Sequence, residues 1–167
     1  MKYAVSFIGW SNTGKTGLIG QLLVKLRSRG YSVAVLKQSH VPADIDRSGK
    51  DTDRFFEKGA DKVGYFSPNG GFLRFRHPPE VGSLEHYFSD CEILLLESLP
   101  LGGYPCFEVV GPENEEKGYK TRPEEVTGYI WNGEHPPTGR QLNGVPVLSS
   151  RDPDKIIHVL EELWNIR

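Results

Sequence analysis

The sequence predicts an α/β protein: an open, mainly parallel sheet that is flanked by helices and carries an inserted β-hairpin. Apolar runs of strand length alternate along the chain with segments of helical periodicity, an order typical of parallel sheets. Residues 2–37 form a strand–helix–strand pattern, which indicates a βαβ unit with a right-handed crossover. Two aromatic-rich runs around Pro68-Asn-Gly-Gly71 predict the hairpin at 62–76.

The composition indicates one globular domain over residues 1–167, with 37% hydrophobic residues and a net charge of −2. The chain lacks the basic excess of a nonspecific nucleic-acid binder, and it has no apolar run of membrane-spanning length. Because its start leads directly into a strand, without a signal-peptide layout, we expect a cytoplasmic protein that binds neither nucleic acid nor a membrane. Cys91 and Cys106 show no metal-site spacing and need not pair.

The most informative stretch joins the first strand to the first helix. It has the pattern G-x-x-x-x-G-K-T, from Gly9 to Thr16. Its glycines allow consecutive N–H groups to curl around an anion, and the helix that follows directs its positive end to the same place. We therefore predict a P-loop NTPase-like fold, in which Lys15 reaches the β/γ-phosphates and the Thr16 hydroxyl binds Mg²⁺. The nucleotide-binding residues expected in this loop are Gly9, Ser11, Asn12, Thr13, Gly14, Lys15, Thr16 and Gly17.

The helices and strands after the phosphate loop are predicted from hydrophobic periodicity and from the residues that end helices and strands. Leucines and isoleucine at helical spacing predict a helix over 18–26, and the apolar run 32–37 is a strand. The polar stretch 42–53 is expected as a loop, followed by a short helix over 52–58. The hairpin then has more aromatic residues than a solvated ribbon needs, so that they either pack on their own domain or form a subunit contact.

After the hairpin, a short helix over 83–88 is expected, with Ser83 as its N-cap. Residues 90–97 form a second buried parallel strand that ends in a carboxylate. In P-loop folds the strand beside the phosphate loop ends in an acidic residue that holds Mg²⁺, usually through water, so Glu97 is the candidate.

The rest of the chain completes the sheet. Apolar runs at 106–110, 126–131 and 145–148 are expected as strands, and the Glu-, Lys- and Pro-rich stretch 113–125 as a mobile, solvated loop. Asp152 caps the last helix. The residues of that helix expected to face the core are Ile156, Ile157, Leu160, Leu163 and Trp164.

A second cluster narrows the choice among P-loop proteins. The segment Asp44-Ile-Asp-Arg-Ser-Gly-Lys-Asp-Thr-Asp-Arg54, followed by Gly59-Ala60, together with the phosphate loop, resembles the molybdopterin-guanine dinucleotide biosynthesis adaptor family, known as MobB. That family carries a D-x-D-x-P-G-K-D-S type segment at this place. Leu96-Glu-Ser98 resembles its E-G strand end, and Pro105-Cys-Phe-Glu-Val-Val110 its P-K-I-E-V-V type strand.

The resemblance implies a GTP-binding homodimer that uses GTP and Mg²⁺, hydrolyses GTP slowly and assists the molybdopterin guanylyltransferase in molybdenum cofactor maturation. Molybdenum-cofactor-loading proteins are further expected partners. The family belongs to the same broad class as the signal-recognition-particle GTPases and MinD-like proteins, whose D-T-x-R element resembles Asp51-Thr-Asp-Arg54. By this resemblance, Asp51 would order an attacking or Mg²⁺-bound water and Arg54 would meet phosphate charge. The alternative is a charged helix start. Expected catalytic residues are Lys15, Asp51 and Arg54, and expected metal-binding residues are Thr16, Glu97 and Asp51.

The chain departs from the family pattern in three places. The family's K-H-x-H-H is Lys37-Gln-Ser-His-Val41 here, so Gln38 and Val41 replace histidines and His40 remains alone, as a ligand or as an ordinary loop residue. The proline of P-G-K-D is Ser48, and the glycine of E-G is Ser98.

Base choice and function class stay open at this point. There is no N-K-x-D element for guanine. Asn132-Gly-Glu134 and Ser149-Ser-Arg-Asp152 each follow a strand, and either could line a base pocket or form a turn or helix cap. An ATP-dependent small-molecule kinase is the main alternative, but it needs an arginine-rich lid, and 113–125 offers Lys117, Lys120 and Arg122. A metallochaperone GTPase needs a His/Cys cluster, which five scattered histidines and two separated cysteines do not supply.

Overall fold

The computed structural model describes residues 2–41, 46, 48–112, 114–134, 141–142 and 144–166. The chain divides into two compact units, one made of residues 1–38 and 87–167 and the other of residues 39–86. Among the described residues, no helix is long and apolar enough to cross a membrane.

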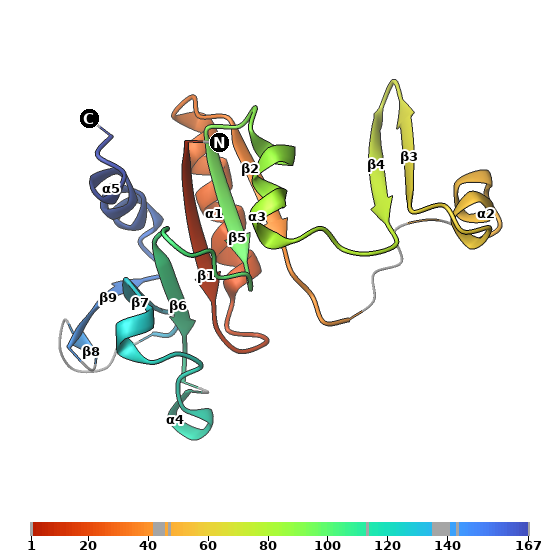
Figure 1. Ribbon diagram of the computed structural model, residues 1–167. Helices are drawn as coiled ribbons and strands as arrows, with labels where there is room; N and C mark the ends of the chain where they lie inside the picture. Colours follow the sequence, from red (N-terminus) through yellow and green to blue (C-terminus); the bar gives the residue numbers. More distant parts are fainter. Residues whose placement is uncertain are drawn as a thin grey trace. The chain divides into compact units, whose positions relative to one another are not determined.

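The first unit is built on a twisted sheet whose strands run in the order β2-β5-β1-β6-β7-β9-β8 (Figure 1). All neighbouring strands in the described part of this sheet are parallel except β8 and β9. This confirms the predicted open, mainly parallel sheet; β8 was not predicted. The strands are β1 (Tyr3–Ile8), β2 (Val33–Lys37), β5 (Ile93–Glu97), β6 (Cys106–Val110), β7 (Gly128–Trp131), β8 (Gln141–Leu142) and β9 (Val145–Ser149).

The two strands of the predicted βαβ unit are parallel but are not neighbours, because β5 lies between them. Ile93 of β5 is in register with Tyr3 of β1 on one side and with Val33 of β2 on the other. The same register places Glu97, the last residue of β5, beside Phe7 and Lys37. The carboxyl ends of three strands therefore meet where the phosphate loop begins.

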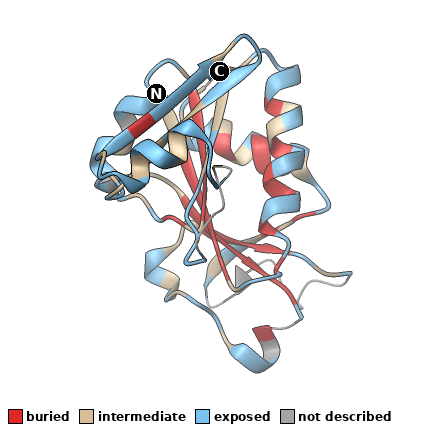
Figure 2. Cartoon of the chain, turned by 90° about the vertical axis from the view of Figure 1, so that its right-hand side faces the viewer, coloured by how far each residue is buried: buried red, intermediate tan, exposed pale blue. Residues whose placement is uncertain are grey.

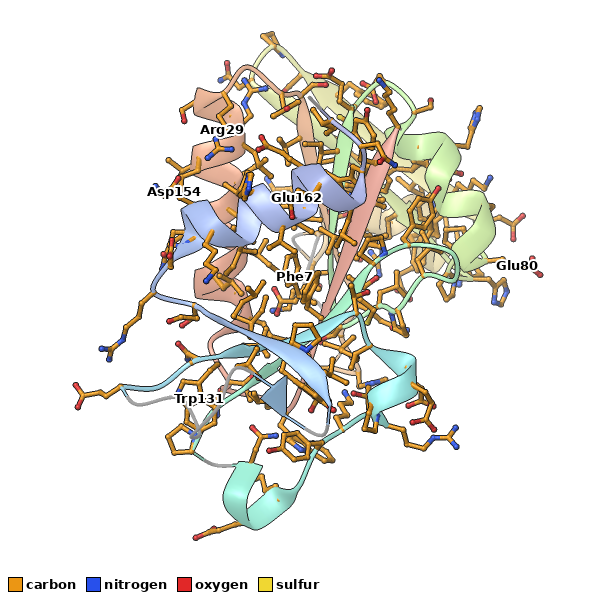
Figure 3. All side chains as sticks on the ribbon, turned by 90° about the vertical axis from the view of Figure 1, so that its left-hand side faces the viewer. Phe7, Arg29, Glu80, Trp131, Asp154 and Glu162 are labelled. Carbon is orange, nitrogen blue, oxygen red and sulfur yellow. The ribbon has the colours of Figure 1, made fainter. Side chains whose placement is uncertain are left out.

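Helices α1 (Lys15–Ser28) and α5 (Pro153–Leu163) share one hydrophobic core with the sheet. Figure 2 shows the buried residues gathered along the strands of this sheet. Outside the core, Asp154 of α5 accepts from Lys25 and Arg29 of α1 at 2.7 and 3.3 Å, and Figure 3 shows Arg29 and Asp154 close together. The core residues contributed by the two helices are Leu18, Ile19, Leu22, Leu26, Ile156, Ile157 and Leu160.

At the two ends of α5, the predicted N-cap is confirmed and the predicted burial of Leu163 is wrong. Asp152 caps the helix as predicted, since its carboxylate accepts the Lys155 N–H at 3.0 Å. Leu163 is 43% exposed rather than buried. Trp164, which was also predicted to face the core, packs against it and stacks on Tyr3 with ring centroids 5.4 Å apart.

The second unit contains α2 (Asp51–Glu57), the hairpin β3 (Lys62–Ser67) and β4 (Gly70–Phe75), and α3 (Val81–Leu84), which is followed by the 3₁₀ turn η1 (Glu85–Phe88). The predicted hairpin is confirmed, with a shorter turn, because Ser67 already pairs with Gly70. Its strands are mostly exposed (Figure 2), and the Phe66 side chain is 83% exposed. Ser83 is not an N-cap: it lies within α3 and its hydroxyl donates back to the Glu80 carbonyl.

The stretch expected as a solvated loop, 113–125, contains two short helical turns, α4 (Asn114–Lys117) and η2 (Pro123–Glu125). It is tied down by buried polar groups. Asn114 is buried; its amide oxygen accepts the Gly111 N–H and its amide nitrogen donates to the Gly118 carbonyl, both at 2.9 Å. The composition pointed to solvation because the two anchoring groups are themselves polar, Asn114 here and Glu108 in β6.

Candidate phosphate-binding site

The loop between β1 and α1 requires glycine at both ends of its pattern. Gly9 has φ +138°, and a Cβ there would lie 2.4 Å from the Val109 carbonyl oxygen in β6. Gly14 has φ +87°, and a Cβ there would lie 2.3 Å from the side-chain nitrogen of Asn132. Both positions combine a conformation that side chains rarely adopt with a close approach from a neighbouring strand end. The sheet therefore dictates the tight course of the loop.

Lys15 lies across this loop. Its Nζ donates to the carbonyl oxygens of Gly9 at 3.1 Å and Trp10 at 2.5 Å, and to the Thr13 hydroxyl at 3.4 Å. The side chain is only 6% exposed, so its positive charge is concentrated in the curl of the backbone. Helix α1 begins here without a side-chain cap and without an acidic residue in its first turn. A buried ammonium and a helix N-terminus in one place favour an anion.

Thr16 and Glu97 lie together beside the loop. The Thr16 hydroxyl donates to Glu97 Oε1 at 2.8 Å, and Glu97 is only 5% exposed. The position of Glu97 is set by the register of β5, which runs parallel to β1 with Glu97 opposite Phe7. Immediately after it, Ser98 has φ +62° and its N–H donates to the Phe7 carbonyl at 2.9 Å, which fixes the chain where it leaves the strand.

Asn132 reaches the loop from the end of β7. Its Nδ2 donates to the Thr13 carbonyl at 3.0 Å, and its Oδ1 accepts the Ser150 hydroxyl at 2.8 Å. The amide thus joins the loop to Ser150, which directly follows β9 and belongs to the second stretch considered for the base pocket. A role of Asn132 in reading the base stays a prediction.

Trp10 of the loop and Glu108 of β6 both hold the segment that follows β6, and neither was predicted as a site residue. The Trp10 indole donates to the Gly118 carbonyl at 2.9 Å. Glu108 is fully buried and accepts the backbone N–H groups of Lys120 at 2.7 Å and Thr121 at 3.1 Å, as well as the Thr121 hydroxyl. The sequence signal for Glu108 was a carboxylate within an apolar strand pattern. A buried carboxylate needs hydrogen-bond donors, so this position predicts a nearby segment that supplies them.

Asp51 and Arg54 belong to the second unit, where both are exposed on α2. Their action together with the phosphate loop stays a prediction. Asp53, between them, accepts the Gly49 N–H at 2.9 Å and pairs with Arg74 at 3.1 Å. The Gly49 N–H first, and then the Arg74 guanidinium, lower the pKa of the Asp53 carboxyl.

The other residues of this cluster are placed in part. Thr52 donates to Asp46 at 3.0 Å, whereas Asp44 and Arg47 lie outside the described residues. Gln38, which replaces the first histidine of the family pattern, donates its backbone N–H to the Glu97 carbonyl oxygen at 2.9 Å. Within the described part of the chain, no three His, Cys, Asp or Glu side chains are grouped to hold a metal ion.

Comparison with known proteins identifies related sequences. The family model described as "Molybdopterin guanine dinucleotide synthesis protein B" (MobB) matches residues 4–130. The "Molybdopterin-guanine dinucleotide biosynthesis adapter protein" of Escherichia coli K12 is 28% identical over 123 residues, which cover 73% of this chain and 70% of that protein. A probable protein of the same description from Bacillus subtilis 168 is 28% identical over 163 residues, covering 95% and 92%.

Solved structures agree on the fold. The crystal structure of Bacillus subtilis MobB superposes with a TM-score of 0.75 at 22% identity, covering 96% of this chain and 97% of that one. A MobB protein homolog from Bacillus stearothermophilus gives a TM-score of 0.63 at 17% identity, covering 98% and 99%. The sheet order, the loop after β1 and these likenesses together confirm the predicted P-loop type of fold.

Proposed function

The chain belongs to the MobB family of adapter proteins in molybdopterin guanine dinucleotide biosynthesis, and we propose that it acts there through Mg²⁺-dependent binding and slow hydrolysis of GTP. The observation that carries the proposal is the geometry around Lys15, Thr16 and Glu97. A buried ammonium lies across the curled backbone, and a hydroxyl–carboxylate pair lies directly beside it. That arrangement suits a triphosphate with its metal.

The donor set fits Mg²⁺. A threonine hydroxyl and a glutamate carboxylate are hard oxygen ligands. Their oxygen atoms are 2.8 Å apart, and Glu97 is almost fully buried. Thr16 and Glu97 would hold the ion, and Asp51 is proposed as a further contact through water. Bound there, Mg²⁺ would neutralise charge on the phosphates.

The residues of the chain have separable tasks in this proposal. The backbone N–H groups from Ser11 to Thr16 donate to phosphate oxygens, and Lys15 supplies the positive charge. Asp51 orders the attacking water, and Arg54 meets the developing negative charge. With a single arginine and no further base assigned, slow hydrolysis is expected, as suits a protein that works mainly through contact with a partner.

We propose the molybdopterin guanylyltransferase as that partner, with molybdenum-cofactor-loading proteins as further candidates. The exposed hairpin residues Tyr65 and Phe66, at 49% and 83%, support a homodimer contact through β3 and β4. The cytoplasm is the proposed location. Membership in the family does not favour the kinase alternative.

The test is nucleotide binding by the whole chain. We expect fluorescent GTP to bind in Mg²⁺ more tightly than fluorescent ATP. Lys15→Ala should abolish binding, because it removes the charge from the loop. Lys25→Ala is the matched control: it also removes one lysine of α1, but one that pairs with Asp154 at the surface, and it should bind as the wild type does. Tighter ATP binding, or unchanged binding by Lys15→Ala, would contradict the proposal.

The partner is tested separately. The tagged chain, with GTP and Mg²⁺, should retain a purified molybdopterin guanylyltransferase on a column, and Lys15→Ala should retain less. Absence of any association with GTP present would remove the adapter proposal for that enzyme, whatever the nucleotide result.

A further inference from the structure

Glu97 has a second partner, Lys37, on the side away from the loop. Lys37 ends β2 and is in register with Glu97 at the end of β5. Its Nζ lies 2.9 Å from Glu97 Oε1, the same oxygen that accepts the Thr16 hydroxyl at 2.8 Å. One carboxylate oxygen is therefore shared between the proposed metal-binding hydroxyl and an ammonium group.

The two members of this ion pair differ in burial. The Glu97 side chain is 7% exposed, whereas the Lys37 side chain is 55% exposed. A buried carboxylate needs a counter-charge, and Lys37 supplies it. Because β2 lies at the end of the described strand order, the Lys37 stem can swing into water without opening the core. The ion pair can thus be broken by movement of Lys37 into water, whereas Glu97 stays buried.

We propose that Lys37 is a resident cation that positions Glu97 and that a divalent cation must displace from Oε1. This rests on the proposed function, since it takes Thr16 and Glu97 as the metal-binding residues. The Lys37 ammonium lies 2.9 Å from Oε1, so a divalent cation held by the same oxygen, directly or through one water, would be close enough to repel it strongly. Metal binding is then coupled to release of the Lys37 ammonium into water at the end of the described strand order.

The competition is tested by titrating Mg²⁺ into the full chain with fluorescent GTP. Lys37→Met keeps the length and apolar stem of the side chain but removes the charge. We expect its half-saturating Mg²⁺ concentration to be about tenfold lower than that of the wild type. Lys25→Met, which breaks the surface pair with Asp154, is the matched control and should titrate as the wild type does. An unchanged or higher Mg²⁺ requirement for Lys37→Met would overturn the proposal.

The positioning role is tested without nucleotide or metal, by thermal unfolding in EDTA. Lys37→Met should lower Tm by about 2–4 °C, since it leaves the buried carboxylate without its ammonium. In a Glu97→Gln background the same substitution should have little effect, because the carboxamide carries no charge. An equal loss in both backgrounds would overturn the proposal.

Failure of the two proposals can be told apart. If the wild type bound no nucleotide, the proposed function would fail, and the competition would be decided with Mn²⁺ alone, followed by electron paramagnetic resonance. Tighter Mn²⁺ binding by Lys37→Met than by the wild type and Lys25→Met would support it, and equal binding would overturn it.

Discussion

The hydroxyl of Thr16 and the carboxylate of Glu97 meet at 2.8 Å although the two residues are 81 positions apart in the chain. The contact joins the first turn of α1 to the last residue of β5. It exists because β5 enters the sheet beside β1 and ends level with the start of the phosphate loop. Variants around this junction therefore test both the fold and the site.

Ser98, which follows Glu97, should gain stability from replacement by glycine. Its φ of +62° is strained for a residue with a Cβ, and the family pattern that this chain resembles has glycine there. Ser98→Gly is expected to raise the free energy of unfolding by about 1 kcal/mol in urea. Ser28→Gly, in the last turn of α1, should change it in the opposite direction. A loss with Ser98→Gly would mean that the serine side chain has a partner that outweighs the strain.

Gly9 should not tolerate a methyl group. The Cβ of Gly9→Ala would meet a backbone carbonyl, that of Val109, at 2.4 Å, and neither strand can yield without disturbing the sheet. We expect a loss of about 2–4 kcal/mol in the free energy of unfolding together with loss of nucleotide binding. Gly20→Ala is the control: it lies within α1, nothing lies within 4 Å of its Cβ, and helix propensity predicts a gain of about 0.5–1 kcal/mol. Equal effects of the two variants would contradict the described loop.

Glu108 should be essential for the segment after β6. Its carboxylate accepts two backbone N–H groups and one hydroxyl, whereas a carboxamide would present its own N–H groups to those donors. Glu108→Gln is expected to cost about 2 kcal/mol and to speed hydrogen exchange at Lys120 and Thr121. Glu116→Gln, at an exposed position of α4, should change neither measurement. Unchanged exchange at Thr121 in Glu108→Gln would contradict the anchoring role.

Cys106 should make stability fall at alkaline pH. Burial first, and the nearby Glu108 charge second, raise the pKa of its thiol from 9.0 to about 11. A raised pKa in the folded chain means that the contribution is complete below pH 9 and is lost as the pH rises from 9 to 11. Between pH 8 and 10.5, the wild type should lose about 2 kcal/mol relative to Cys106→Ala in urea unfolding. A constant difference would show that the thiol ionises as freely in the folded chain as in the unfolded one.

The sequence predicted those parts of the molecule whose signal is local. The phosphate loop, the hairpin and the N-cap of α5 are each specified by a few adjacent residues, so the sequence was sufficient to predict them. The pairing of β5 with both β1 and β2 was not predicted in detail, because nothing in residues 33–37 or 93–97 says which apolar strand each will accept. Consequently Lys37 was seen only as part of a strand and a histidine motif, although register brings it to Glu97.

The segment 113–125 is mostly exposed, as predicted, but the groups that hold it were not predicted, for a related reason. Its composition is that of a solvated loop, but three polar groups outside or at its edge (Trp10, Glu108 and Asn114) hold it by hydrogen bonds to its backbone. Every residue has backbone donors and acceptors, so the sequence does not show which of them a distant side chain will bind. Asn132 illustrates the same point, since both ends of its amide are used by the Thr13 carbonyl and by Ser150.

The most direct test of the central claim is a crystal structure of the chain grown with Mn²⁺ and a non-hydrolysable GTP analogue, with anomalous scattering used to locate the metal. The triphosphate should follow the backbone from Gly9 to Thr16, and the manganese peak should lie about 2.1 Å from the Thr16 hydroxyl oxygen and within one water of Glu97. A nucleotide bound elsewhere, or a manganese peak away from Thr16 and Glu97, would contradict it.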